Sequence, residues 1–265
     1  MCSRYLAPRL RWPPVSKREF KAVVLDLFDT LVKWEPDRLP LMEVNGKQVR
    51  TTMPWVFPTL ERRLGAKFNQ QGFVEVYSAV VDEILIERER DHLEITCHER
   101  FSRTLKRMSH PEDEIHLFAH DLTRVHMDAV RSVTWAPVER SDAVRRIAQH
   151  YRLGLLSNFD DAQCGREVLL DSGVADLFEA IIISAEVGLR KPNPRIYRRI
   201  LEMLRLDANE VLFVGDTPRE DVAGPQAVGM QTVWISKGAA AVPDGIPQPN
   251  FVIKDLSELP TLLGI

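Results

Sequence analysis

Residues 22–31 read Ala22-Val23-Val24-Leu25-Asp26-Leu27-Phe28-Asp29-Thr30-Leu31. An apolar run here leads directly into a carboxylate, which is followed closely by a threonine and another apolar residue. Short apolar runs are typical of buried strands in a parallel sheet, and open α/β sheets bind ligands at the carboxyl ends of their strands. The stretch therefore predicts a first strand over residues 22–28, with Asp26 placed for chemistry at the sheet edge.

The chain after residue 137 alternates short apolar runs with helical periods, which is typical of a parallel sheet. We expect strands over residues 151–157, 180–184, 211–216 and 231–236. Their continuous apolar character indicates helices on both faces, so the predicted fold is α/β with a doubly wound parallel sheet. Helix boundaries agree with this: Asn193-Pro194 is a typical helix start, and Gly173 and Gly229 lie where helices should stop.

The periodicity between residues 33 and 136 is helical instead. Apolar side chains recur at three and four residues in two series, namely Phe73, Val76, Tyr77, Val80 and Ile84, and then Ile115, Phe118, Leu122 and Val125. We therefore expect an inserted α-helical cap at residues 35–136 and an α/β core built from residues 21–34 and 137–265. The linkers near residues 33–36 and 135–137 are the candidate hinges.

Two shorter segments have their own signatures. Residues 1–20 are basic but contain Pro8, Pro13 and Pro14, which break any amphipathic helix, so we expect an N-terminal extension and not a transit peptide. Within residues 41–50, Asn45-Gly46 is the signature of a tight hairpin turn.

Composition restricts the class of protein. The 265 residues are 45% hydrophobic and carry a net charge of -3, so no overall field attracts nucleic acid or an anionic membrane. No apolar run approaches the ~20 residues that span a bilayer. The cysteines, Cys2, Cys97 and Cys164, contain no C-x-x-C pair, which argues against a disulfide framework or structural zinc. We expect a cytoplasmic protein that acts on a small molecule, with no nucleic-acid or membrane partner.

Polar motifs follow the later apolar runs in a fixed order. They are Ser157-Asn158, then Lys191-Pro192, then Gly215-Asp216 with Asp221 five residues on. Each has an ordinary structural explanation, because Asp is common in turns and at helix starts and an isolated Lys is usually a surface residue. Their joint occurrence after Asp26 favours one functional site.

This order resembles the haloacid dehalogenase-like hydrolase superfamily, in the branch with a helical cap, whose motifs are a nucleophilic Asp, a Ser or Thr, a Lys and an acidic pair. The resemblance implies that Asp26 is the nucleophile, that Ser157 binds phosphoryl oxygens with Asn158 assisting, and that Lys191 neutralises charge. It also implies Mg²⁺ as cofactor. The implied ligands are the Asp26 carboxylate, the Phe28 backbone carbonyl and Asp216, with Asp221 supporting the ion directly or through water.

One position departs from the family pattern. Phosphatases of the superfamily carry a second Asp two residues after the nucleophile, as general acid and base, and this chain has Phe28 there. Asp29 is the nearest carboxylate. Adjacent positions on an extended segment point to opposite sides, so we expect Asp29 to face away from the substrate and to cap the loop.

Three interpretations remain open at this point. The first is Mg²⁺-dependent hydrolysis of a small phosphate ester or acyl phosphate through an aspartyl phosphate. The second is a metal-independent 2-haloacid dehalogenase, which Phe28 and Asn158 favour and the Gly215-Asp216 motif opposes. The third is a binding or regulatory protein with little catalysis.

Arginines of the predicted cap have two interpretations. Arg88, Arg90, Arg100, Arg103 and Arg107 could bind an anionic substrate when the cap closes. The helical spacing of the last three, opposite apolar positions, favours a solvated face instead.

Overall fold

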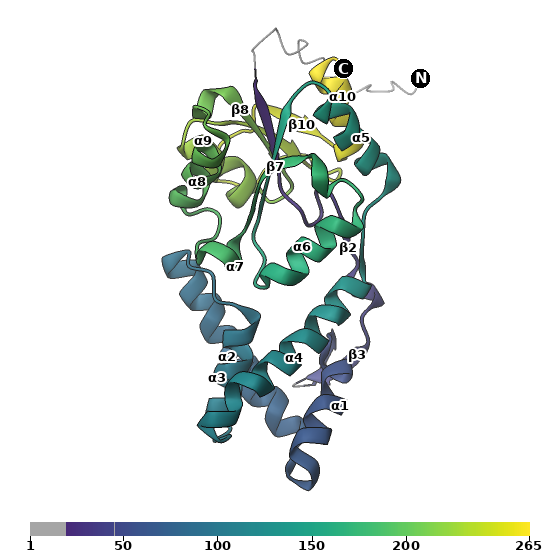
Figure 1. Cartoon of the computed structure of the whole chain (residues 1–265), viewed down its shortest axis with the longest axis vertical. Helices are drawn as coiled ribbons and strands as arrows, with labels where there is room; N and C mark the ends of the chain where they lie inside the picture. Colours follow the sequence, from purple (N-terminus) through teal and green to yellow (C-terminus); the bar gives the residue numbers. More distant parts are fainter. Residues whose placement is uncertain (1–19, 45) are drawn as a thin grey trace, which may run out of the picture.

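The computed structural model describes residues 20–44 and 46–265. The predicted extension at residues 1–19 and Asn45 of the hairpin turn lie outside the described residues. Figure 1 shows a sheet with its covering helices at one end of the molecule and a group of helices at the other. Within the described ranges, no helix combines the length and apolar character that crossing a bilayer requires.

In the described part of the chain, six parallel strands form the main sheet, in the order β10-β9-β8-β1-β6-β7. Their bounds are β1 Ala22–Leu25, β6 Arg152–Ser157, β7 Phe178–Ile183, β8 Val211–Gly215, β9 Gln231–Ile235 and β10 Phe251–Ile253. The four later strands predicted from the sequence are present, with ends shifted by one or two residues. The short strand β10 was not predicted, because three residues are too few to show a period.

The end predicted for the first strand is wrong. β1 stops at Leu25, and the chain then turns, because the backbone N–H groups of Leu31 and Val32 both donate to the Leu27 carbonyl at 2.9 Å. Phe28 takes part only in an isolated bridge to Val32. The apolar character of Leu27 and Phe28 reflects packing of this turn and not a longer strand.

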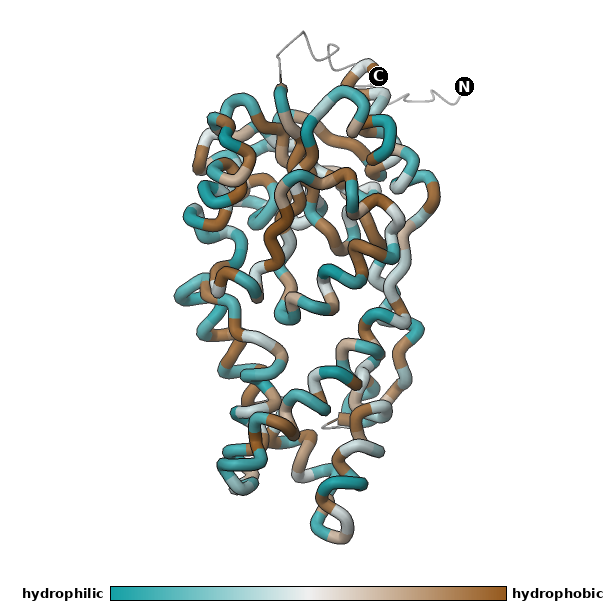
Figure 2. Tube along the Cα trace, viewed as in Figure 1, coloured by the Kyte–Doolittle hydropathy of each residue, from teal (hydrophilic) through white to brown (hydrophobic). Residues whose placement is uncertain are grey.

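The strands bury both of their faces, as a doubly wound sheet requires. Val23 and Leu25 face one apolar cluster, together with α5 (Val138–Ala148) and α6 (Ala162–Asp171), whereas Ala22 and Val24 face another, with α8 (Pro194–Leu204). Figure 2 shows hydrophobic colouring concentrated along these central strands. The alternation along β1 therefore places helices on both sides of the strand that leads to Asp26.

Helix ends are where the sequence predicts them. The Asn193 side chain accepts the Arg195 N–H at 3.0 Å, and Pro194 is the first residue of α8. Gly173 follows α6 with φ 67°, and Gly229 follows α9 (Gly224–Ala227) with φ 95°. The remaining short helices are α7 (Ser184–Val187), α10 (Leu259–Leu263), the π-helix η5 (Pro218–Ala223), and the 3₁₀ turns η1 (Pro36–Arg38), η2 (Gly65–Lys67), η3 (Ala175–Leu177), η4 (Ala208–Glu210) and η6 (Leu256–Glu258).

The segment between β1 and α5 is mainly helical, with helices α1 (Met53–Leu64), α2 (Gln70–Asp91), α3 (Cys97–Arg107) and α4 (Glu112–Ser132). A hairpin of β3 (Leu41–Val44) and β4 (Lys47–Arg50) precedes them, as predicted. Two short linker strands, β2 (Lys33–Trp34) and β5 (Thr134–Trp135), pair antiparallel where this segment leaves and rejoins the sheet. Figure 1 shows the helices grouped beyond the carboxyl ends of the strands. We propose that residues 35–136 act as a cap on the α/β core of residues 21–34 and 137–265.

Candidate active site

A cavity of about 150 Å³ lies at the carboxyl ends of the central strands. Asp26 directly follows β1, Ser157 ends β6, and Asp216 directly follows β8, whereas Lys191 comes from the loop between α7 and α8. The structure brings every residue singled out in the sequence for the site to this cavity. Its lining residues are Asp26, Phe28, Asp29, Ser157, Asn158, Lys191, Asp216, Thr217, Glu220 and Asp221.

Lys191 is the central charge of the site. Its side chain is only 2% exposed, and Nζ donates to Asp26 Oδ1 at 2.8 Å and to Asp221 Oδ1 at 2.7 Å. Burial alone would lower the pKa of Lys191, but Asp221 and Asp26 raise it above its usual value, so the ammonium is charged. Burial raises the pKa of Asp26 to about 8, against the opposing effect of Lys191. A further positive charge in the cavity would therefore favour the ionised carboxylate of Asp26.

Three carboxylates converge beside Lys191. Asp26, Asp216 and Asp221 each offer an oxygen, and these oxygens lie within 4.8 Å of one another. Gly215 makes room for the arrangement, because a Cβ at this position would lie 2.3 Å from the Asp221 carboxyl carbon. The Thr217 N–H fixes the same carboxylate by donating to Asp221 Oδ2 at 2.8 Å. A cluster of carboxylate oxygens is the donor set that Mg²⁺ prefers, so the residues fit a divalent cation.

Ser157 has an unsatisfied hydroxyl. The residue is 1% exposed, and its Oγ has no hydrogen-bond partner among residues 20–44 and 46–265. An unpaired buried polar group costs about 1–3 kcal/mol, so such a group is usually retained for a ligand. The Ser157 hydroxyl, at the cavity wall, is available to an oxygen of a bound molecule.

Asn158 lines the cavity, but its amide is engaged with the backbone. Its Oδ1 accepts the Lys191 N–H at 2.7 Å, and its Nδ2 donates to the Lys191 carbonyl at 2.9 Å. Asn158 thus holds the Lys191 loop, and its assistance to a phosphoryl group stays a prediction.

Phe28 stands where phosphatases of the superfamily carry the second Asp, and it forms an aromatic pair. Phe28 stacks on Phe159, with ring centroids 4.6 Å apart and the planes inclined by 29°. Of this pair, Phe28 lines the cavity, and its side chain offers no proton donor or acceptor.

The expectation that Asp29 lies on an extended segment is wrong. The residue is not extended, because β1 has already ended and its φ is 57°. Its Oδ1 accepts the N–H of Trp34 at 3.3 Å, and its Oδ2 lies 3.1 Å from Lys237 Nζ. Asp29 thus binds the linker strand β2 and also lines the cavity.

Sequence reasoning missed two residues at the site. Lys237 Nζ lies 2.9 Å from Asp216 Oδ2, and Glu220 lines the cavity beside Asp221. Lys237 follows β9 at the same edge of the sheet, so the strand-end rule that identified Asp26 could have identified it too. Burial raises the pKa of Glu220, and the Tyr197 hydroxyl fixes its backbone by donating to its carbonyl at 2.5 Å.

A cluster of ion pairs joins the inserted helices to the sheet next to the cavity. Asp160, in the loop between β6 and α6, accepts from Arg100 of α3 at 2.8 Å and from Arg88 of α2 at 3.3 Å. The expectation of a solvated face is wrong for Arg100, whose side chain is 12% exposed. It fits Arg103 and Arg107, which are more exposed and pair with glutamates of the same helical segment.

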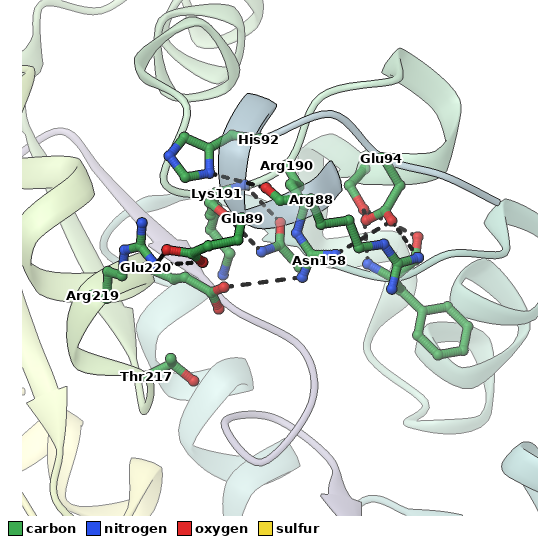
Figure 3. Close-up of polar contacts among 12 residues, drawn as sticks. Arg88, Glu89, His92, Glu94, Asn158, Arg190, Lys191, Thr217, Arg219 and Glu220 are labelled. Atoms are coloured by element: carbon green, nitrogen blue, oxygen red, sulfur yellow. Dashed lines mark hydrogen bonds and ion pairs between the residues drawn. The ribbon is translucent and has the colours of Figure 1, made fainter. Parts of the chain in front are cut away.

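The loop between α2 and α3 extends this contact, as Figure 3 shows for Arg88, Glu94 and Arg190. Glu94 accepts from Arg88 at 2.7 Å and from the Ser184 hydroxyl at 2.5 Å. The Arg190 N–H donates to the His92 carbonyl at 3.1 Å, directly beside Lys191 in the chain. The inserted helices are therefore attached to the loop that carries Lys191.

Comparison with known proteins identifies the family and several relatives. A family model described as haloacid dehalogenase-like hydrolase matches residues 20–229. The chain is 37% identical over 108 residues to a phosphoserine phosphatase of Thermus thermophilus (40% of this chain, 42% of that protein). It is 36% identical over 102 residues to a glyceraldehyde 3-phosphate phosphatase of Pyrococcus abyssi (38% and 42%). The chain thus spans less than half the length of these curated relatives.

Two solved structures share the fold over nearly the whole chain. A 2-haloacid dehalogenase from Pseudomonas syringae superposes with a TM-score of 0.67 at 22% identity, covering 92% of this chain and 98% of that one. A HAD phosphatase from Thermococcus onnurineus superposes with a TM-score of 0.60, also at 22% identity and with the same coverage. The same architecture therefore occurs with both chemistries, and the residues of the site must distinguish them.

Proposed function

Because the chain belongs to the haloacid dehalogenase-like hydrolases, we propose that it hydrolyses a small phosphate ester or acyl phosphate with Mg²⁺, through an aspartyl phosphate on Asp26. The observation that carries this proposal is the convergence of three carboxylates, Asp26, Asp216 and Asp221, around the buried ammonium of Lys191. The aligned relatives that are named as phosphatases support phosphate as the reacting group.

In the first step, an Asp26 carboxylate oxygen attacks phosphorus, and the bond from phosphorus to the leaving oxygen breaks with its electron pair on that oxygen. Lys191 orients the nucleophile through its 2.8 Å contact and offsets negative charge as the phosphoryl group transfers. The free hydroxyl of Ser157 would donate to a phosphoryl oxygen.

The acidic cluster would hold the cofactor. Asp26, Asp216 and the Phe28 backbone carbonyl are the proposed ligands, with Asp221 in support. When bound, Mg²⁺ supplies charge neutralisation for the nucleophile and the phosphoryl oxygens. Its positive charge would also oppose the effect of burial on the pKa of Asp26.

In the second step, water attacks phosphorus, and the bond from phosphorus to the Asp26 oxygen breaks with its electron pair on that oxygen. A proton of the water passes to solvent, inorganic phosphate is released, and the Asp26 carboxylate is regenerated. The Phe28 side chain can neither take the proton from this water nor protonate the first leaving group. The loss of a general acid or base costs ~10² to 10⁴ in rate, and the cost falls most heavily on alkoxide leaving groups. The carboxylate of an acyl phosphate leaves without a proton and therefore needs no acid at position 28. An acyl phosphate is thus the substrate class that fits a site with Phe28 best.

One observation favours a second candidate, the metal-independent 2-haloacid dehalogenase. The Phe28–Phe159 stack is an apolar surface beside the nucleophile, and a halide leaves without a proton. Against this candidate, the three converging carboxylates form a donor set that suits a divalent cation, which dehalogenase chemistry of this kind does not use. We therefore keep phosphate hydrolysis as the main proposal.

The test is release of inorganic phosphate from a panel of acyl phosphates and small phosphate esters, with Mg²⁺ or with EDTA. Asp26→Asn serves as the blank, and Asp244→Asn, at an exposed position, is the matched control. We expect Mg²⁺-dependent release that is lost in the first variant and kept in the second. Halide release from a 2-halo acid in EDTA, without phosphate release, would replace this proposal with the dehalogenase.

A further inference from the structure

Lys237 lies at the rim of the acidic cluster. Its Nζ is 2.9 Å from Asp216 Oδ2 and 3.1 Å from Asp29 Oδ2, and its side chain is 45% exposed. The ammonium thus sits between an acid of the proposed metal site and an acid outside it. Lys191, the other lysine of the site, contacts the two remaining carboxylates of the cluster and leaves Asp216 to Lys237.

The backbone aims Lys237 at this position. The chain turns directly after β9, with φ 50° at Lys237 and 92° at Gly238, and the Ala239 N–H closes the turn on the Ser236 carbonyl at 2.8 Å. On the facing side, the Trp234 indole N–H donates to the Asp216 carbonyl at 2.9 Å. Both partners of the Lys237–Asp216 pair are therefore held by strand β9 and the turn that follows it.

The location has an electrostatic consequence for any cation. A Mg²⁺ ion held by Asp216 would share that carboxylate with the ammonium of Lys237 and would be repelled by it. Repulsion between like charges near a protein surface is large enough to change the cation affinity by about tenfold. Asp29 offers the ammonium a second partner, so Lys237 has somewhere to remain when Asp216 binds a cation.

We propose that Lys237 competes with Mg²⁺ for Asp216 and thereby sets the cation affinity of the site. This inference rests on the proposed function for the identity of the cation. Lys237 is a positioning residue in this account, because it acts through Asp216 and touches neither substrate nor nucleophile. With weaker binding, the occupancy of the site would follow the concentration of Mg²⁺ around the protein.

The test is the Mg²⁺ dissociation constant of the full chain by isothermal titration calorimetry, without substrate. Lys237→Met and Lys237→Gln remove the charge, and Lys237→Arg keeps it. Lys254→Met removes an equal charge from an exposed position near Lys237 that contacts none of the three carboxylates, and it is the matched control. Thermal unfolding of each variant verifies that it is folded.

We expect Lys237→Met and Lys237→Gln to bind Mg²⁺ about tenfold more tightly, and Lys237→Arg and Lys254→Met to bind within about threefold of the unsubstituted chain. Unchanged or weaker binding in the two neutral variants overturns the inference and leaves the proposed function intact. Absence of Mg²⁺ binding in every protein, including the neutral variants, overturns both. An equal gain in Lys254→Met would assign the effect to overall charge and would also overturn the role of Lys237.

Discussion

Asp26 is subject to two opposing influences at the residue scale. Its burial disfavours the charged form, and Lys191, 2.8 Å away, favours it. The balance leaves the pKa of Asp26 raised to about 8 in the protein without a cation. Without a cation, burial thus favours the protonated form of Asp26, and a bound cation would favour the ionised nucleophile. Keeping the ionised form buried lowers the free energy of unfolding, which can be measured.

This decrease predicts a pH dependence. The pKa of about 8 in the folded protein exceeds the ordinary aspartate value of 3.8, so the folded protein retains a proton that the unfolded chain releases between these pH values. The contribution to stability is complete below pH 4 and is lost as the pH rises toward 8. Asp26→Asn does not titrate, so in EDTA its free energy of unfolding should gain on the unsubstituted chain by on the order of 3 kcal/mol between pH 5 and pH 8.

Urea unfolding at several pH values measures this difference. Asp244→Asn, which changes an exposed carboxylate, should show no such trend. The prediction fails if Asp26→Asn does not gain free energy of unfolding relative to the unsubstituted chain as the pH rises. That result would mean that burial does not dominate the pKa of Asp26.

Phe28 carries the second prediction at this scale. Phe28→Asp supplies the missing carboxylate and should raise kcat/KM for alkyl phosphates by about tenfold to a hundredfold, because a poor leaving group benefits from protonation. The kcat/KM for acetyl phosphate should change little, because its carboxylate leaves without a proton. The variant loses the stack on Phe159, a contact worth about 0.5–1.5 kcal/mol, which a folded domain tolerates.

Steady-state rates on both substrates check this expectation, with Phe28→Leu as an apolar control. An equal gain in Phe28→Leu would show that space, and not the carboxylate, limits the reaction. No gain on alkyl phosphates in Phe28→Asp would show that position 28 does not reach the leaving group.

At the scale of elements, α2 and α3 are attached to the sheet through Asp160. Burial would raise the pKa of Asp160, but Arg100 and Arg88 outweigh it and lower the pKa, so the carboxylate is charged and shared by the two helices. Removing one partner of a buried ion pair leaves the others uncompensated. The attachment should therefore be sensitive to a single substitution.

Asp160→Asn should lower the free energy of unfolding by about 2–4 kcal/mol, because two arginines lose their shared carboxylate. Glu83→Gln is the matched control, since it breaks an exposed pair with Arg107 and should leave the free energy of unfolding nearly unchanged. Hydrogen exchange of the loop at residues 92–97 should accelerate in the first variant only. Equal, small effects in both variants would mean that the Asp160 cluster does not stabilise the contact.

The sequence predicted the elements better than their contacts. The order of apolar runs was sufficient for the parallel sheet, because each buried strand leaves a local signature that does not depend on its partners. The proximity of Asp26 and Asp216 could also be anticipated, since strand ends meet at one edge of a sheet, whereas the place of Lys191 followed from the resemblance to the family.

The remaining features depend on tertiary geometry that spacing does not reveal. The engagement of Asn158 with the Lys191 backbone, and the burial of Arg100 against Asp160, each join residues more than 30 positions apart in the chain. The orientation of Asp29 required the left-handed turn after β1, which an apolar run through Leu27 and Phe28 concealed. Lys237 was missed because a lysine after a strand is usually solvated.

At the scale of the whole molecule, the helical segment and the sheet domain meet at several places, and one of them is the pairing of Arg131 of α4 with Glu167 and Asp171 of α6. The linker strands β2 and β5 pair on one side, and the ion pairs of Asp160 and Glu94 lie on the other, beside the Lys191 loop. Figure 1 shows the helices beyond the edge where the site lies. The small cavity at that edge is lined by residues of the core, and a nucleophilic Asp26 is central to the proposed reaction there.

The most direct test of that claim is to trap the covalent intermediate. The protein is mixed with acetyl phosphate and Mg²⁺, quenched rapidly in acid, and analysed by intact mass and peptide mapping. We predict that the mass of one phosphoryl group is added to the peptide that carries Asp26, and that EDTA or Asp26→Asn abolishes the addition. Release of phosphate with Asp26 unmodified throughout turnover, or undiminished release by Asp26→Asn, would contradict the account.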